Sequence, residues 1–187
     1  GELIVGFQFN SALSRCLNDE ERRQWEKLEA KWARSNLFLN FFGIGNCGAI
    51  PGHLIPNYPK VLKMGFSGLV NYFEELKSNA RTEEHRDFLS ALVIACKAVK
   101  VLADRYAKEA LRLSEEEGDE KRKEELKEIA RIMQKVPWEP AGSFWEALQS
   151  LWFTHMLVMC GESYPGPGLS LGRVDQYLYP YYKQELD

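Results

Sequence analysis

The chain carries, near its carboxyl end, the segment Ser170-Leu171-Gly172-Arg173-Val174-Asp175-Gln176-Tyr177-Leu178-Tyr179-Pro180-Tyr181-Tyr182-Lys183. These positions combine a hydroxyl, a guanidinium, a carboxylate and four tyrosines. Such a density of polar-tipped aromatic side chains suits a buried network more than a solvated tail. We therefore expect this segment to pack on a core, with Arg173 and Asp175 forming a buried ion pair and the tyrosines serving in packing.

Composition limits the class of protein. The 187 residues are 45% hydrophobic and 12% aromatic, which is enough for a substantial core, and we expect one domain over residues 1–187. The formal charge of −3 gives no basic excess that would call for nucleic acid or an anionic membrane. No apolar run reaches the roughly 20 residues that span a bilayer. The amino end also lacks the basic flank and apolar stretch of a signal peptide.

The cysteine pattern favours a reducing, cytoplasmic location and no metal site. Four cysteines are present and none belongs to a C-x-x-C pair: Cys16, Cys47, Cys96 and Cys160. The three histidines have no paired ligand spacing, so a metalloenzyme is not expected. Cys96 and Cys160 fall in apolar helical patterns, where a buried reduced thiol is the default.

Hydrophobic periodicity predicts a mainly α chain with few short strands. Residues 2–9 are interpreted as a short strand or an extended segment. A helix that begins near Asn18 presents Trp25, Leu28 and Trp32 at helical spacing, and we expect this amphipathic face to lie on a core.

Apolar repeats predict four further helices, at about 60–76, 83–114, 119–135 and 144–160. Gly65 and Gly68 weaken the first of these and can divide it into two. Ser143 and Glu146 have the spacing of a capping box at the start of the last. His155 lies within that last helix and is expected to be a hydrogen-bonded core histidine.

Residues 40–59 are rich in Gly and Pro, yet the side chains between them are apolar and aromatic. A solvated linker would be polar, so we expect an ordered and largely buried loop. Such loops often carry function. Taken by itself, the ring of His53 in this loop is best explained as a hydrogen-bonded structural group.

Three earlier groups of residues accompany the segment that begins at Ser170. The first two are Glu2-Leu3-Ile4-Val5-Gly6, and Gly52-His53-Leu54-Ile55-Pro56-Asn57-Tyr58 with Lys60-Val61-Leu62 and Gly65. The third joins Arg105-Tyr106-Ala107 to Val136-Pro137-x-x-Pro140-Ala141-x-x-Phe144-x-Glu146-Ala147-x-Gln149-x-x-Trp152-Phe153. In this order, the four groups resemble signatures of the glycyl radical enzymes, the pyruvate formate-lyase-like family.

The resemblance implies the dehydratase and decarboxylase branch, because the arginine-rich segment expected near His53 in pyruvate formate-lyase is missing. It implies an α/β barrel, of which this chain would be the helical N-terminal portion. In the family, a glycyl radical abstracts hydrogen from a cysteine, and the thiyl radical then abstracts a substrate hydrogen. A separate activating enzyme that uses S-adenosylmethionine and an iron–sulfur cluster installs the radical.

The chain departs from the family pattern at the radical residues. The thiyl cysteine of the family lies in G-C-x-E and the radical glycine in R-V-x-G-[YF], and neither motif occurs here. We therefore expect an N-terminal piece of a longer lyase, with no catalytic residue and no cofactor of its own, that is inactive alone.

The resemblance also implies site residues. His53 and Ser170 are expected to face the substrate, and Ile44 and Asn46 in the same loop as His53 are weaker candidates. Partners of the parent enzyme would be a small-molecule substrate, the activating enzyme and further copies of the chain in a homo-oligomer. The aromatic loop 40–59 favours an arylacetate over a diol, choline or isethionate as substrate.

A second hypothesis is a standalone, non-catalytic helical interaction domain derived from the family. The apolar loop 40–59 and the aromatic carboxyl-terminal segment argue against it, since a free chain would expose an apolar patch that invites association. A monomeric, non-aggregating chain would favour it.

Overall fold

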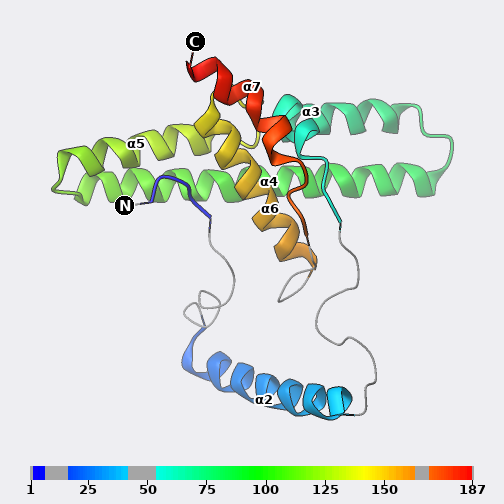
Figure 1. The fold of residues 1–187 in the computed structure, drawn as a ribbon. Coiled ribbons are helices and arrows are strands. Elements are labelled where there is room, and N and C mark those ends of the chain that lie inside the picture. The colour runs from blue at the N-terminus through cyan, green and yellow to red at the C-terminus, as the bar shows by residue number, and fades with distance from the viewer. Residues whose placement is uncertain (1, 7–16, 42–53, 163–168, 187) are drawn as a thin grey trace. The chain divides into compact units, whose positions relative to one another are not determined.

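The computed structural model of the protein describes residues 2–6, 17–41, 54–162 and 169–186. These residues form α2 (Asp19–Phe41), α3 (Tyr58–Ser78), α4 (Glu83–Glu116), α5 (Glu120–Lys135), α6 (Phe144–Glu162) and α7 (Val174–Leu186) (Figure 1). No strand occurs among the described residues, so the mainly α prediction is confirmed and the few short strands are not seen there. The α/β barrel around this portion stays a prediction. None of the described helices is long and apolar enough to cross a membrane.

The described residues fall into two compact units. The first unit comprises residues 1–6, 56–155 and 171–187, and it holds α3, α4, α5, most of α6 and α7. The second unit comprises residues 7–55 and 156–170, and it holds α2 and the last turns of α6. The single domain expected over residues 1–187 stays a prediction, and each unit is described by itself below.

The first unit is organised along α4. Short turns fold α3 and α5 back onto this long helix, so that α3 lies along one half of α4 and α5 along the other (Figure 1). Thr82 begins α4 by accepting a hydrogen bond from the backbone N of His85 at 3.2 Å, which satisfies a donor in the first turn. Small side chains dominate the second half of the buried face of this helix. The buried residues are Leu89, Val93, Cys96, Val99, Ala103, Ala107, Ala110 and Ser114.

A kink at Gly65 divides α3, as the sequence predicts. Gly65 has φ 65° and ψ 171°, so the helical hydrogen-bond pattern is interrupted there. The loop between α5 and α6 supplies replacement partners for the interrupted helix. Phe66 N donates to Pro137 O at 2.9 Å, and Ser67 N donates to Trp138 O at 2.8 Å. The kink and the loop therefore stabilise each other, because each satisfies backbone groups that the other leaves open.

The start of α6 is anchored by a buried carboxylate. Glu146 N donates to Ser143 Oγ at 3.2 Å, which confirms Ser143 as the cap. The Glu146 side chain, 4% exposed, accepts hydrogen bonds from Gly142 N at 2.8 Å and from Lys135 Nζ at 2.6 Å. Burial alone would raise the pKa of Glu146, but these hydrogen bonds hold it below its usual value. The carboxylate thus ties α5 to α6 across the intervening loop.

Residues 2–6 are bound to α6 by side chains rather than by a strand. Three side chains on one stripe of α6 donate to carbonyl oxygens of this segment: Trp145 to Leu3 at 3.1 Å, Gln149 to Val5 at 2.7 Å and Trp152 to Gly6 at 3.2 Å. Gln149 also accepts from Val5 N at 2.8 Å, so its buried amide replaces a strand partner. The expected strand is therefore absent over residues 2–6, and residues 7–9 lie outside the described residues.

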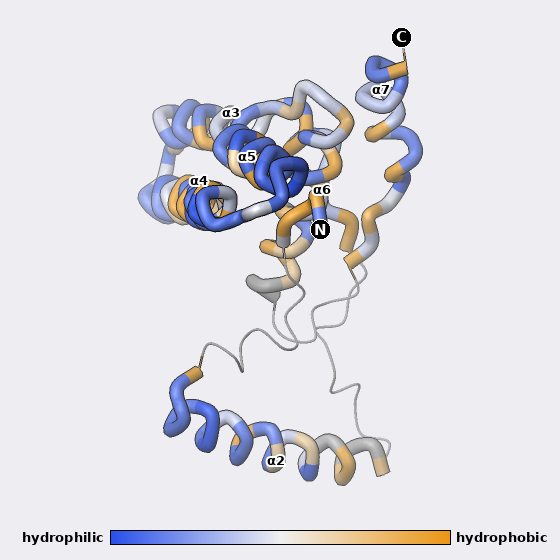
Figure 2. Tube along the Cα trace, turned by 90° about the vertical axis from the view of Figure 1, so that its left-hand side faces the viewer, coloured by the Kyte–Doolittle hydropathy of each residue, from blue (hydrophilic) through white to orange (hydrophobic). Residues whose placement is uncertain are grey.

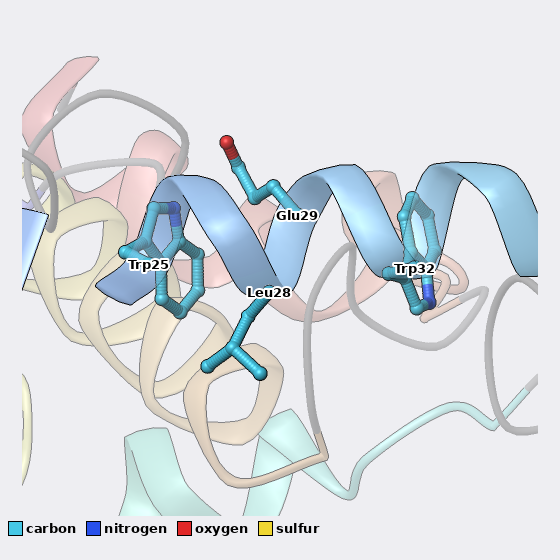
Figure 3. Close-up of a pocket in the computed structure, with 4 residues that line it drawn as sticks. All are labelled: Trp25, Leu28, Glu29 and Trp32. Atoms are coloured by element: carbon cyan, nitrogen blue, oxygen red, sulfur yellow. The ribbon is translucent and has the colours of Figure 1, made fainter. Parts of the chain in front are cut away.

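Helix α2 of the second unit corrects one expectation. Trp25 is half-buried, whereas Leu28 and Trp32 are exposed, so burial of this face on a core is wrong for these two side chains. Together with Glu29, the three residues line a pocket on the helix (Figure 3). Periodicity identifies the apolar face correctly, but burial needs a partner surface that a periodic pattern does not specify.

Replacing Gly65 by alanine is expected to lower the free energy of unfolding by about 3 kcal/mol or more, because of strain at positive φ and overpacking. An added Cβ would lie 2.3 Å from Trp138 O. Urea denaturation followed by circular dichroism measures the change. Gly118→Ala is the matched control, since a Cβ there meets nothing within 4 Å. Equal effects of the two substitutions would contradict the role given to the kink.

Candidate functional site

Two segments that are distant in the sequence meet in the second unit. Ser170 N donates a hydrogen bond to Leu54 O at 3.1 Å. Leu54 directly follows His53, so the two motif segments lie side by side at this point. Ser170 is exposed, which leaves its hydroxyl accessible. Its position is therefore compatible with contact to a ligand.

Three of the four predicted site residues lie outside the described residues: Ile44, Asn46 and His53. Their roles stay predictions. The described end of their loop differs from expectation, because Leu54 and Ile55 are exposed rather than buried. The apolar character of residues 40–59 is thus not by itself a sign of burial over its whole length.

Tyr58 and His155 form a buried phenol–imidazole pair in the first unit. Tyr58 lies four residues after Leu54 in the sequence. Asn57 caps α3 by accepting from Lys60 N at 3.2 Å, and Tyr58 begins the helix. The Tyr58 hydroxyl and His155 Nδ1 share a hydrogen bond of 2.7 Å, and both residues are buried. The prediction of His155 as a hydrogen-bonded core histidine is confirmed.

Burial sets the protonation of this pair. Desolvation, with a smaller contribution from Tyr177, raises the pKa of Tyr58 to about 12. Desolvation also lowers the pKa of His155 below its usual 6.5. At neutral pH, both groups are therefore uncharged, and the phenol can donate to an unprotonated Nδ1. The pair is suited to holding structure rather than to transferring protons.

The same cluster fixes the segment after Ser170. Tyr177 donates to Leu171 O at 2.7 Å, and the Tyr177 and Tyr58 rings lie 6.2 Å apart between centroids. Leu178 completes a buried cluster with residues of α3 and α6: Tyr58, Leu62, Ala147 and Leu151. Apolar residues run along much of α6 at this core (Figure 2). The first turns of α7 are thereby held on α3 and α6.

Gly172 allows the chain to turn into α7. Its φ is 69°, a conformation that side-chain-bearing residues rarely adopt. Gly172 O also accepts from Val174 N at 3.0 Å, which closes the turn. Gly172 is therefore needed for the conformation of the backbone. The hydroxyl of Ser170 is the polar side-chain group next to this turn.

Two expectations for the carboxyl-terminal segment are wrong in part. Arg173 and Asp175 do form an ion pair, at 2.9 and 3.1 Å, but their side chains are 69% and 64% exposed rather than buried. The hydrogen bond from Arg173 lowers the pKa of Asp175. Tyr177 and Tyr181 are half-buried, whereas Tyr179 and Tyr182 are exposed. Because α7 packs one face only, half of its aromatic side chains stay outside the core.

The described residues contain no cluster of His, Cys, Asp and Glu that could hold a metal ion. Cys96 is buried, and desolvation raises the pKa of its thiol, so it is an unreactive core residue as expected. Cys16 and Cys47 lie outside the described residues.

Comparisons with known proteins agree on one family. A family profile described as "Pyruvate formate lyase-like" matches residues 26–187. Isethionate sulfite-lyase of Desulfovibrio desulfuricans is 41% identical over 137 residues, which are 70% of this chain and 16% of that protein.

Two solved structures are also similar. The B12-independent glycerol dehydratase from Clostridium butyricum superposes with a TM-score of 0.67 at 38% identity, covering 72% of this chain and 18% of the dehydratase. A glycyl radical enzyme from Archaeoglobus fulgidus superposes with a TM-score of 0.69 at 30% identity, covering 95% of this chain and 24% of that enzyme. The chain thus spans less than a quarter of the length of each of these three proteins.

The buried state of His155 predicts a pH dependence of stability. Since its pKa is lowered in the folded protein, the unfolded chain binds more protons below pH 6.5. This contribution to stability is fully present above about pH 6.5 and is lost as the pH falls below it. Wild-type protein should therefore lose more stability between pH 7.5 and 5.5 than His155→Asn, which cannot be protonated. Urea midpoints at both pH values measure the loss, and the exposed His85→Asn variant should behave like wild type.

Proposed function

Because the chain belongs to the glycyl radical enzymes of the pyruvate formate-lyase-like family, we propose that it contributes substrate-contacting residues to a glycyl radical lyase. One observation carries the proposal. The hydrogen bond from Ser170 N to Leu54 O brings together the two motif segments that the family resemblance assigns to the substrate site. Two segments that serve one ligand must meet, and these do.

His53 and Ser170 have the chemistry for this role. The ring of His53 can donate to a substrate hydroxyl, carboxylate or sulfonate, and the hydroxyl of Ser170 can donate or accept. Ile44 and Asn46 add an apolar and an amide contact as secondary candidates. Such contacts would position a small substrate for cleavage of a C–C, C–O or C–N bond. An arylacetate substrate stays a prediction.

The radical chemistry of the parent enzyme is supplied by other residues. A glycyl radical, installed by a separate activating enzyme with S-adenosylmethionine and an iron–sulfur cluster, would provide hydrogen abstraction. The sequence lacks the G-C-x-E and R-V-x-G-[YF] motifs that hold the thiyl and glycyl radicals. The residues of this chain would bind and orient the substrate, and the chain alone would be inactive.

A standalone helical interaction domain is the second candidate function. Exposed apolar side chains on α2 favour it, since such a face can bind another protein. The two functions differ in one requirement. Only the lyase function needs the side chains of His53 and Ser170, while an interaction domain needs the helix faces.

Substitution of the site residues in the longer parent enzyme tests the proposal. His53→Ala and Ser170→Ala should each lower kcat/KM by roughly ten-fold or more, the loss expected for one hydrogen bond of about 1.4 kcal/mol. The radical yield, measured by electron paramagnetic resonance, should stay unchanged. Ser78→Ala, at an exposed serine that ends α3, is the control. Unchanged kinetics in both site variants would remove them from the substrate site.

The isolated 187-residue chain should acquire no radical. Anaerobic incubation with an activating enzyme, S-adenosylmethionine and reductant should give no glycyl doublet in the electron paramagnetic resonance spectrum. A full-length glycyl radical enzyme treated in parallel is the positive control. A doublet from the isolated chain would show that a glycine of this portion can hold the radical, contrary to the proposed division of roles.

A further inference from the structure

Two hydrogen bonds hold the backbone on either side of the Ser170 side chain. Ser170 N donates to Leu54 O at 3.1 Å, and Leu171 O accepts from the Tyr177 hydroxyl at 2.7 Å. The first bond lies in the second unit and the other in the first unit, and the Ser170–Leu171 peptide bond joins them. Because the peptide bond is planar, only the φ and ψ angles of Ser170 and Leu171 separate the two held atoms. The Ser170 side chain therefore projects from a backbone that is restrained at both ends.

Leu171 is held by more than this hydrogen bond. Its side chain packs against the buried cluster that includes Tyr58 and Leu178. Gly172 follows with φ 69°, which fixes the turn into α7. The Leu171 carbonyl is thus a well-defined acceptor for the Tyr177 hydroxyl.

Tyr177 is itself a restrained group. It lies in the first turn of α7, and its half-buried ring is 6.2 Å from the buried ring of Tyr58, measured between centroids. Desolvation raises the pKa of Tyr177, so the phenol stays protonated at neutral pH and donates to the Leu171 carbonyl. The anchor is therefore a neutral donor on a packed ring.

The chain that follows Leu54 is held in a similar way. Pro56 O accepts from Tyr58 N at 2.8 Å, and Asn57 caps α3. Tyr58 thus restrains the chain just after Leu54, as Tyr177 restrains the chain just after Ser170. Both restraints belong to one aromatic cluster of the first unit.

Packing explains the ring of Tyr177 but not its hydroxyl. Tyr181, one turn later on α7, is also half-buried and packs against the same cluster. Its hydroxyl forms no hydrogen bond with any of the described residues, so a phenylalanine would fill that position equally well. A phenylalanine at position 177 would instead leave the partly buried Leu171 carbonyl without its donor. The Tyr177 hydroxyl thus has a role that packing of α7 does not require.

We propose that Tyr177 is a positioning residue for Ser170. Its hydroxyl, acting through the Leu171 carbonyl, keeps Ser170 paired with Leu54 and sets the direction of the Ser170 hydroxyl. That hydroxyl forms no hydrogen bond to another described residue, so the backbone that carries it decides where it points. The inference rests on the proposed function, in which the Ser170 hydroxyl contacts a small substrate. Such a contact group must be held within about 0.5 Å of its productive position.

Amide hydrogen exchange of the 187-residue chain, followed by NMR, tests the positioning directly. Tyr177→Phe keeps the ring, and the Ser170 amide should exchange roughly ten-fold or more faster, because one of its two restraints is lost. Tyr181→Phe is the matched control and should leave this rate within about two-fold of wild type. An unchanged Ser170 rate in Tyr177→Phe would overturn the proposal. Equal acceleration of the amides of α5 would also overturn it, since that result reports a general loss of stability.

Kinetics of the longer parent enzyme separate this inference from the proposed function. Tyr177→Phe should lower kcat/KM by roughly three-fold or more when Ser170 is present, and by less than about 1.5-fold in a Ser170→Ala background, where no hydroxyl remains to be positioned. If Ser170→Ala itself has no effect, the proposed function fails and the inference fails with it. If Ser170→Ala lowers kcat/KM but Tyr177→Phe has the same effect in both backgrounds, or none in either, the positioning role alone is overturned.

Discussion

The buried phenol of Tyr58 is the group on which the first unit depends most. Tyr58 is 1% exposed, its hydroxyl is hydrogen-bonded to His155 on α6, and its ring lies 6.2 Å from that of Tyr177 on α7, measured between centroids. Three helices are thus joined at one residue. Because a buried hydroxyl without a partner is costly, this hydrogen bond fixes how the start of α3 meets α6. The same cluster holds the turn that follows Ser170.

Several family motif residues among the described residues have structural roles. Gly65 and Pro137 join the kink of α3 to the loop before α6. Gln149 and Trp152 bind the backbone of residues 2–6. Ser170 differs from these, because its side chain is exposed while its backbone N is held by Leu54. A motif position that packing does not explain is the better candidate for contact with a substrate.

Local chemistry made much of the fold predictable. The positions of α2 to α6 follow from periodicity, whereas α7 was not predicted from it. The Ser143 cap, the break at Gly65 and the buried His155 follow from residue type and spacing. Features that need a partner surface were not predictable. Exposure of the Arg173–Asp175 pair and of Trp32 depends on what lies opposite each helix, which no local pattern specifies. The binding of residues 2–6 by Gln149 joins chain segments far apart in the sequence, so no local pattern could predict it.

We infer that this chain belongs to the substrate-binding portion of a radical lyase whose radical residues lie further along the sequence. Sequencing the source DNA downstream of the codon for Asp187 is the sharpest test of this inference. We expect an open frame that continues to a G-C-x-E motif and then to a late R-V-x-G-[YF] motif. A stop codon directly after Asp187 would refute the inference, because no group in this chain could then generate or hold the radical.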